Sequence, residues 1–169
     1  TEGGGGVTRI GNGGLFMAYS HVGHDCIIGD GAIIANGVAL AGHIVIEDHV
    51  HISGLAAAHQ FVQLGRLSFV SGLTGVAMDV APYCTVAGAR AELAGLNLVG
   101  LQRSGMNEDQ IVELATSHAR MVQELAHKQP GTHWTFQYSP ELFSGTELAF
   151  SKRVVDAVST MTAPGELFS

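Results

Sequence analysis

The chain of 169 residues carries a formal net charge of −7, with eight lysines and arginines against fifteen aspartates and glutamates. The few cations are scattered, which argues against a nucleic-acid-binding surface, because such a surface needs a basic stripe. No apolar stretch reaches about 18 residues without a glycine or a charge, so we expect no membrane span. No basic, hydrophobic leader precedes the first repeat, and the sequence therefore predicts a soluble, cytoplasmic protein. Cys26 and Cys84 are expected to be reduced thiols.

Apolar residues recur at every sixth position through the first half of the chain. They are Ile10, Phe16, Val22, Ile28, Ile34, Leu40, Ile46, Ile52, Ala58, Leu64, Val70 and Val76. A period of six fits neither a helix nor a flat strand, but it fits a three-sided coil whose successive turns stack at about 4.8 Å. Glycine and asparagine are expected at the corners, where φ is positive. The pattern predicts a mainly β protein that begins with a left-handed parallel β-helix, a hexapeptide-repeat solenoid, over residues 1–85.

The repeat also predicts which residues lie side by side. Three sides of six residues make a coil of about eighteen residues, so position n should stack on position n + 18. This register places His24 beside Gly42, with His43 one residue further on. Each histidine by itself could equally be a solvated or corner-bonding side chain. His21 and His24 have a spacing that metal ligands can use, but no set of Cys or carboxylate ligands completes a site, so we expect no metal and no other cofactor.

Nothing before Ile10 could cover the open end of the β-helix, so we expect either that the β-helix is truncated at its N-terminus or that another subunit covers this end. The repeat stops after Val80, and Pro82 marks the break. Residues 86–106 are rich in alanine and glycine and are predicted to be an irregular connection.

Residues 107–169 are predicted to form a helical tail. Asn107 can cap an amphipathic helix that runs to about His127. Alternating aromatic and polar residues predict a short extended segment at 134–138. A capping box that begins at Ser144 predicts a second helix.

The histidine motifs resemble those of UDP-N-acetylglucosamine acyltransferase, the family that begins lipid A biosynthesis. The resemblance covers about residues 1–117, and the motifs occur in the family's order and spacing. It is carried by His21-Val-Gly-His24-Asp25-Cys26, Leu40-Ala-Gly42-His43, His59-Gln60-Phe61 and Gly95-Leu-Asn97-Leu-Val-Gly100-Leu-Gln-Arg103. It implies that a homotrimer moves a 3-hydroxyacyl chain from acyl carrier protein to the 3-hydroxyl of UDP-N-acetylglucosamine, without a covalent intermediate.

The same resemblance implies roles for individual residues. His24 would be the general base, Asp25 would support its imidazole, and the Gly42 amide would bind the thioester oxyanion. Gln60 would lie near the acyl chain, whose length Gly72 would measure. The full set of substrate-binding residues would be His21, His43, His59, Gln60, Gly72, Asn97 and Arg103, the last two reaching the nucleotide phosphates.

Residues 118–164 resemble instead a segment of 2-isopropylmalate synthase, through the run from Trp134 to Phe150 that includes Ser139 and Glu141. The hypothesis is a composite chain, a truncated acyltransferase solenoid joined to a synthase fragment. The alternative is a divergent acyltransferase tail. Two other functions stay open, namely a non-catalytic fragment of the family and the related N-acyltransferase that acts on an acylated glucosamine nucleotide.

Overall fold

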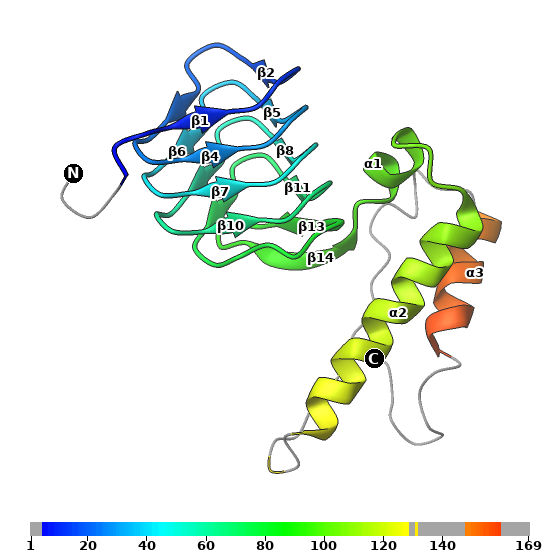
Figure 1. The fold of residues 1–169 in the computed structure, drawn as a ribbon. Coiled ribbons are helices and arrows are strands. Elements are labelled where there is room, and N and C mark those ends of the chain that lie inside the picture. Colours follow the sequence, from blue (N-terminus) through cyan, green and yellow to red (C-terminus); the bar gives the residue numbers. More distant parts are fainter. Residues whose placement is uncertain (1–4, 129–130, 132–147, 160–169) are drawn as a thin grey trace. The chain divides into compact units, whose positions relative to one another are not determined.

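The computed structural model describes residues 5–128, 131 and 148–159 (Figure 1). Contacts divide the chain into two units, Thr1–Gly100 and Leu101–Ser169. The first unit is built from short strands joined by tight turns. These strands are β1 (Arg9–Ile10), β2 (Leu15–Phe16), β3 (His21–Val22), β4 (Ile27–Ile28), β5 (Ile33–Ile34), β6 (Ala39–Leu40), β7 (Val45–Ile46), β8 (His51–Ile52), β9 (Ala57–Ala58), β10 (Gln63–Leu64), β11 (Phe69–Val70) and β12 (Gly75–Val76).

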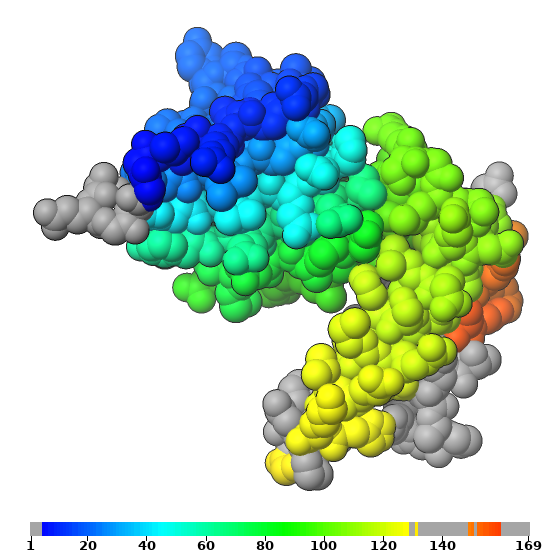
Figure 2. Space-filling view, viewed as in Figure 1, coloured from blue at the N-terminus to red at the C-terminus, as the bar shows by residue number. Residues whose placement is uncertain are grey.

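The strands form three sheets, one for each side of a coil. Their orders are β1-β4-β7-β10, β12-β9-β6-β3 and β14-β13-β11-β8-β5-β2. Among β1 to β12 every pairing is parallel and joins residues eighteen apart, as Ile28 joins Ile46. Ile28, Ile34 and Leu40 therefore lie on three successive sides of one coil. The predicted β-helix is confirmed, and Figure 2 shows its coils following one another in chain order, from blue to green.

The axis of the β-helix is filled by the six-residue repeat. Ile34, Leu40 and Leu64 are fully buried, and Ile52 is almost so. A second inward stripe, which includes Val38 and Ile44, completes this core. Burying one such aliphatic side chain stabilises the fold by about 1.5–3 kcal/mol, so the ladder is the main stabilising feature of this unit.

The corners of the coils differ from the expectation of glycine and asparagine. Many of them are occupied at positive φ by larger residues, among them Asp25 (φ 58°), His43 (φ 62°) and Phe61 (φ 67°). The left-handed conformation costs about 1–2 kcal/mol for a residue with a Cβ. Several of these corners offset part of this cost, because their N–H donates to a carbonyl of the preceding coil, as His43 N–H does to His24 O and Phe61 N–H does to Gly42 O.

Residues 86–106 are not irregular, and that prediction was wrong. β13 (Cys84–Ala87) continues one sheet by parallel pairing with β11, and β14 (Glu92–Leu96) pairs antiparallel with β13. A short helix, α1 (Leu98–Arg103), follows. Phe69 pairs with Thr85, which is sixteen residues further on and not eighteen, so the six-residue register ends here. The backbone of β13 still forms hydrogen bonds with the open edge of β11, and this pairing needs no six-residue period.

The second unit contains α2 (Glu108–His127) and α3 (Leu148–Ser159), which contact each other. Asn107 and Gln110 form the capping box that starts α2, so the predicted start and end of this helix are confirmed. Arg153 of α3 makes ion pairs with two acidic residues in the first turn of α2, Glu108 and Asp109.

The extended segment predicted at 134–138 and the capping box predicted at Ser144 lie outside the described residues. Within the described ranges, none of the helices combines the length and the apolar character that a membrane span requires.

Candidate active site

The candidate site lies at one corner of the β-helix, where two successive coils turn from one sheet to the next. His24 and Asp25 form the turn between β3 and β4, and Gly42 and His43 form the turn between β6 and β7. The His43 N–H donates a hydrogen bond of 2.9 Å to the His24 carbonyl, so the second turn is fixed directly on the first. The repeat therefore brings two histidines, an aspartate and a glycine together from two turns that lie eighteen residues apart in the chain.

The His24 imidazole lies across Gly42. A Cβ at position 42 would lie 2.6 Å from His24 Cε1 and 2.7 Å from Nε2, closer than real Cβ contacts. Only glycine therefore leaves room for the ring in this place. The His24 side chain is still 54% exposed, so a substrate can reach it. The predicted juxtaposition of His24 and Gly42 is confirmed.

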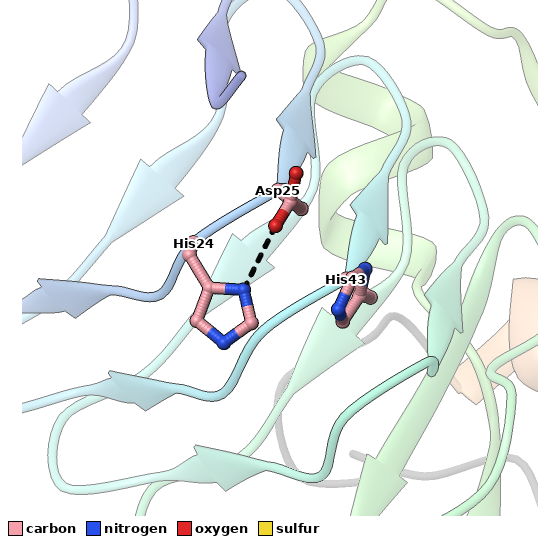
Figure 3. A group of neighbouring side chains, drawn as sticks. All are labelled: His24, Asp25 and His43. Carbon is pink, nitrogen blue, oxygen red and sulfur yellow. Dashed lines mark hydrogen bonds and ion pairs between the residues drawn. The ribbon is translucent and has the colours of Figure 1, made fainter. Parts of the chain in front are cut away.

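Asp25 orients the His24 ring. Asp25 Oδ2 lies 2.9 Å from His24 Nδ1 (Figure 3). Asp25 Oδ1 accepts a hydrogen bond of 2.6 Å from the Gly6 N–H. The hydrogen bond from His24 lowers the pKa of Asp25, while burial raises it and the Gly6 amide lowers it further. A carboxylate anion at Nδ1 favours the tautomer that carries its proton there, which places the basic lone pair of the ring on Nε2.

The Gly42 N–H is the donor that this arrangement leaves available. The amides on either side are used, since Ala41 N–H donates to Ala58 O and His43 N–H donates to His24 O. Within the described part of the chain, no group accepts a hydrogen bond from the Gly42 N–H. Gly42 is half-exposed, so this amide can meet a ligand next to the imidazole.

His43 is held between two rings. Its ring centroid lies 5.0 Å from that of His24 in an edge-on arrangement and 4.7 Å from that of Phe61, with which it is stacked at 15°. Phe61 was not among the predicted site residues. The spacing of eighteen from His43 is the signal in the sequence that could have found it.

The other predicted site residues fall into two groups. His59 and Gln60 lie at the same corner in the following coil, both exposed, and His21 lies exposed on β3 at the edge of this corner. Gly72 lies at a different corner, between β11 and β12, where a Cβ would meet the Gly54 carbonyl oxygen of the neighbouring coil at 3.3 Å.

Asn97 and Arg103 are not brought to the corner of His24 by any contact among the described residues. The Asn97 side chain donates a hydrogen bond of 2.8 Å to Leu67 O and accepts one of 3.0 Å from the Gly100 N–H. These bonds fix the start of α1, at whose end Arg103 lies exposed.

His24, Asp25 and His43 also form a set of metal-ligand types that the sequence argument missed. One ligand atom from each lies within 4.8 Å of the others. The sequence argument compared His24 only with His21, and it did not consider its neighbour Asp25 and the stacked coil.

Comparison with known proteins separates the two parts of the chain. Residues 8–42 match the model of the bacterial transferase hexapeptide repeat, and residues 79–130 match the model of UDP-N-acetylglucosamine O-acyltransferase, domain 2. The acyl-[acyl-carrier-protein]–UDP-N-acetylglucosamine O-acyltransferase of Anaeromyxobacter dehalogenans is 75% identical over 111 residues, which cover 66% of this chain and 43% of that protein. The chain is similar to the UDP-N-acetylglucosamine acyltransferases.

Two further relatives agree with this similarity. The enzyme of the same name from Myxococcus xanthus is 58% identical over 118 residues, or 70% of this chain and 46% of that protein. The structure of UDP-N-acetylglucosamine acyltransferase from Campylobacter jejuni is 32% identical with a TM-score of 0.67, over 95% of this chain and 57% of that one. The chain thus spans only about half the length of the proteins it matches.

These comparisons do not support the resemblance of residues 118–164 to 2-isopropylmalate synthase. The acyltransferase domain model extends to Pro130, beyond the start of that segment. Most of the residues on which the resemblance was based, including Ser139 and Glu141, lie outside the described residues.

Proposed function

We propose that this chain catalyses transfer of a 3-hydroxyacyl group from acyl carrier protein to the 3-hydroxyl of UDP-N-acetylglucosamine, with His24 as general base. The observation that carries the proposal is the His24 ring, held by Asp25 and lying across a glycine whose N–H has no partner among the described residues. The names of the relatives supply the substrates. They also favour an O-acyltransferase over the related N-acyltransferase.

The reaction follows from the positions of two groups, the His24 imidazole and the Gly42 N–H. His24 Nε2 accepts the proton of the sugar 3-hydroxyl as the oxygen attacks the thioester carbonyl, and the C–O bond forms. The resulting oxyanion receives a hydrogen bond from the Gly42 N–H. The tetrahedral species then collapses, the C–S bond breaks, and the leaving thiolate takes the proton back from His24. A positioned base contributes about 10²–10⁴ in rate, and an oxyanion donor about 3 kcal/mol.

The remaining residues receive the roles that the family resemblance implies. His21, His43 and His59 would line the substrate cleft, and Gln60 would contact the acyl chain. This is supported by their position at the corner of His24 or at its edge. Gly72 would limit acyl length. Asn97 and Arg103 would bind the nucleotide phosphates.

Several features of the whole protein belong to this proposal. We expect a cytoplasmic homotrimer with clefts between subunits, which needs no cofactor. We also expect a β-helix over residues 1–85, a connection over 86–106 and a helical tail over 107–169. The composite origin of the tail, from a synthase-like segment at 118–164, stays a prediction that the sequence of the parent gene would test.

The test is acyl transfer by the native chain and by His24→Asn, with 3-hydroxyacyl carrier protein as donor. The matched control is His49→Asn, because the His49 ring also lies against a glycine of the neighbouring coil, Gly31, but at a different corner. We expect His24→Asn to lose at least about 10²-fold in kcat/KM and His49→Asn to keep it. Transfer that survives in His24→Asn would refute the base assignment.

Two controls separate the alternatives. An amine-bearing acylated glucosamine nucleotide, offered beside UDP-N-acetylglucosamine, would identify an N-acyltransferase by its preference. If the native chain fails both to transfer the acyl group and to bind UDP-N-acetylglucosamine, the proposal is overturned in favour of a non-catalytic fragment.

A further inference from the structure

We propose that His24, Asp25 and His43 bind a transition-metal ion of the zinc class, and that the bound ion blocks the acyl-transfer site. The inhibition rests on the proposed function, but the binding does not. Among the described residues, this is the one place where three side chains of metal-ligand type gather closely enough, with one ligand atom from each within 4.8 Å of the others.

The donor set suits zinc and its neighbours in the first transition row. It offers two imidazole nitrogens and one carboxylate oxygen, a combination that open zinc sites use with water in the fourth position. Imidazole selects Zn²⁺, Co²⁺, Ni²⁺ and Cu²⁺ over Mg²⁺ and Ca²⁺, which prefer oxygen ligands. The site should therefore discriminate between these two classes of ion.

The geometry needs only a small adjustment. Zinc-to-nitrogen and zinc-to-oxygen bonds of about 2.0–2.2 Å place tetrahedral ligands roughly 3.4 Å apart. His24 Nδ1 and Asp25 Oδ2 are already 2.9 Å apart, so an ion can replace the proton between them as these atoms separate slightly. His43 must move its ligand atom inward, and rotation of the ring about its side-chain bonds supplies that movement.

A contact outside the cluster preorganises its carboxylate. The Gly6 N–H holds Asp25 Oδ1, which leaves Oδ2 turned toward His24. The stacking of His43 on Phe61 must loosen as the His43 ring turns toward the ion, so the benefit comes from Asp25. Contacts of this kind orient metal ligands and increase affinity, because less freedom is lost on binding.

Binding of the ion abolishes the function of the base. A neutral imidazole that binds the ion through Nδ1 carries its single proton on Nε2, so Nε2 can no longer accept a proton from the sugar hydroxyl. If His24 binds instead through Nε2, the same lone pair is occupied by the metal. Either mode removes the basic nitrogen, and no bond of the substrate changes.

The test measures binding with Co²⁺ and Zn²⁺ on the full chain, purified without an affinity tag and stripped with a chelator. Co²⁺ gives visible d–d absorption when it enters a tetrahedral site, and Zn²⁺ should displace it. The variants are Asp25→Asn and His43→Asn, and the control is His49→Asn. All three positions have φ near +60°, which asparagine tolerates, so none of the variants should add backbone strain.

We expect Asp25→Asn and His43→Asn each to weaken Zn²⁺ binding at least about tenfold, and His49→Asn to leave it unchanged. Zn²⁺, but not Mg²⁺, should inhibit acyl transfer over the concentration range in which it binds, and chelator should restore the rate. Undiminished Zn²⁺ binding in both cluster variants, or transfer that continues at saturating Zn²⁺, would overturn the proposal. Zn²⁺ binding of the expected kind, with no transfer even in chelator, would instead refute the proposed function and leave the metal site intact.

Discussion

The substitution Gly42→Ala tests the contact on which the proposed chemistry depends. The added Cβ would lie 2.6 Å from His24 Cε1, whereas carbon atoms in contact lie about 3.5–4.0 Å apart. Relief of this overlap requires a shift of roughly 1 Å. The His24 ring makes this shift, because it is 54% exposed whereas the backbone of position 42 is held in the coil. That shift breaks or lengthens the hydrogen bond of 2.9 Å between His24 Nδ1 and Asp25 Oδ2.

A misplacement of about 1 Å in a catalytic group costs about 10²-fold in rate, so we expect kcat/KM of Gly42→Ala to fall by about 10²–10³. Stability should change by less than about 1 kcal/mol, because the ring moves toward solvent. Steady-state acyl transfer and thermal unfolding measure the two effects. Gly54→Ala is the matched control, since it occupies the equivalent place at another corner and its Cβ would meet Asn36 O at an ordinary 3.4 Å. Native turnover in Gly42→Ala would refute the reasoning.

Three other changes test the site and the fold. Asp25→Asn should lower kcat/KM by about 10²–10⁴, because a neutral amide no longer favours the Nδ1–H tautomer of His24. This substitution should also change the pH dependence of stability, because folding lowers the pKa of Asp25 from 3.8. The native chain should be more stable than Asp25→Asn above pH 3.8, and this difference should disappear as the pH falls through the folded pKa. Thermal melts in acid measure it. Leu40→Ala, at a fully buried position, should lower the free energy of unfolding by about 2–5 kcal/mol in urea melts. Leu93→Ala is its control, because that side chain is 72% exposed, and an equal loss in both would contradict the axial core. Asn107→Ala removes the cap of α2 and should cost about 0.5–2 kcal/mol, seen as an earlier loss of helical circular dichroism; an unchanged melt would show that the cap does not stabilise this helix.

The repeating part of the fold could be read from the sequence because one short pattern controls it. An apolar residue at every sixth position determines which side chains face the axis, and three sides per coil determine which residues stack. The stacking of His24 on Gly42 follows from this count alone. The helix cap at Asn107 was equally accessible, because it depends on residues close together in the chain.

The segment after the repeat could not be read in the same way. β13 and β14 form because the edge of β11 offers unpaired backbone groups, and a backbone partner leaves little trace in side-chain composition. A stretch rich in alanine and glycine is compatible with either a loop or a strand. The available edge decides between them.

The sequence by itself determined the register of this protein: a period of six gives the coil, and the coil brings a histidine, an aspartate and a glycine to one corner. Only the tertiary structure decided how those groups act on one another. It placed the Gly6 amide on Asp25, stacked Phe61 on His43, and left the Gly42 N–H exposed between two amides that are already bonded. The reason is physical, because hydrogen bonds and ring contacts depend on the corner conformations and on side-chain directions, which the spacing of residues along the chain does not specify.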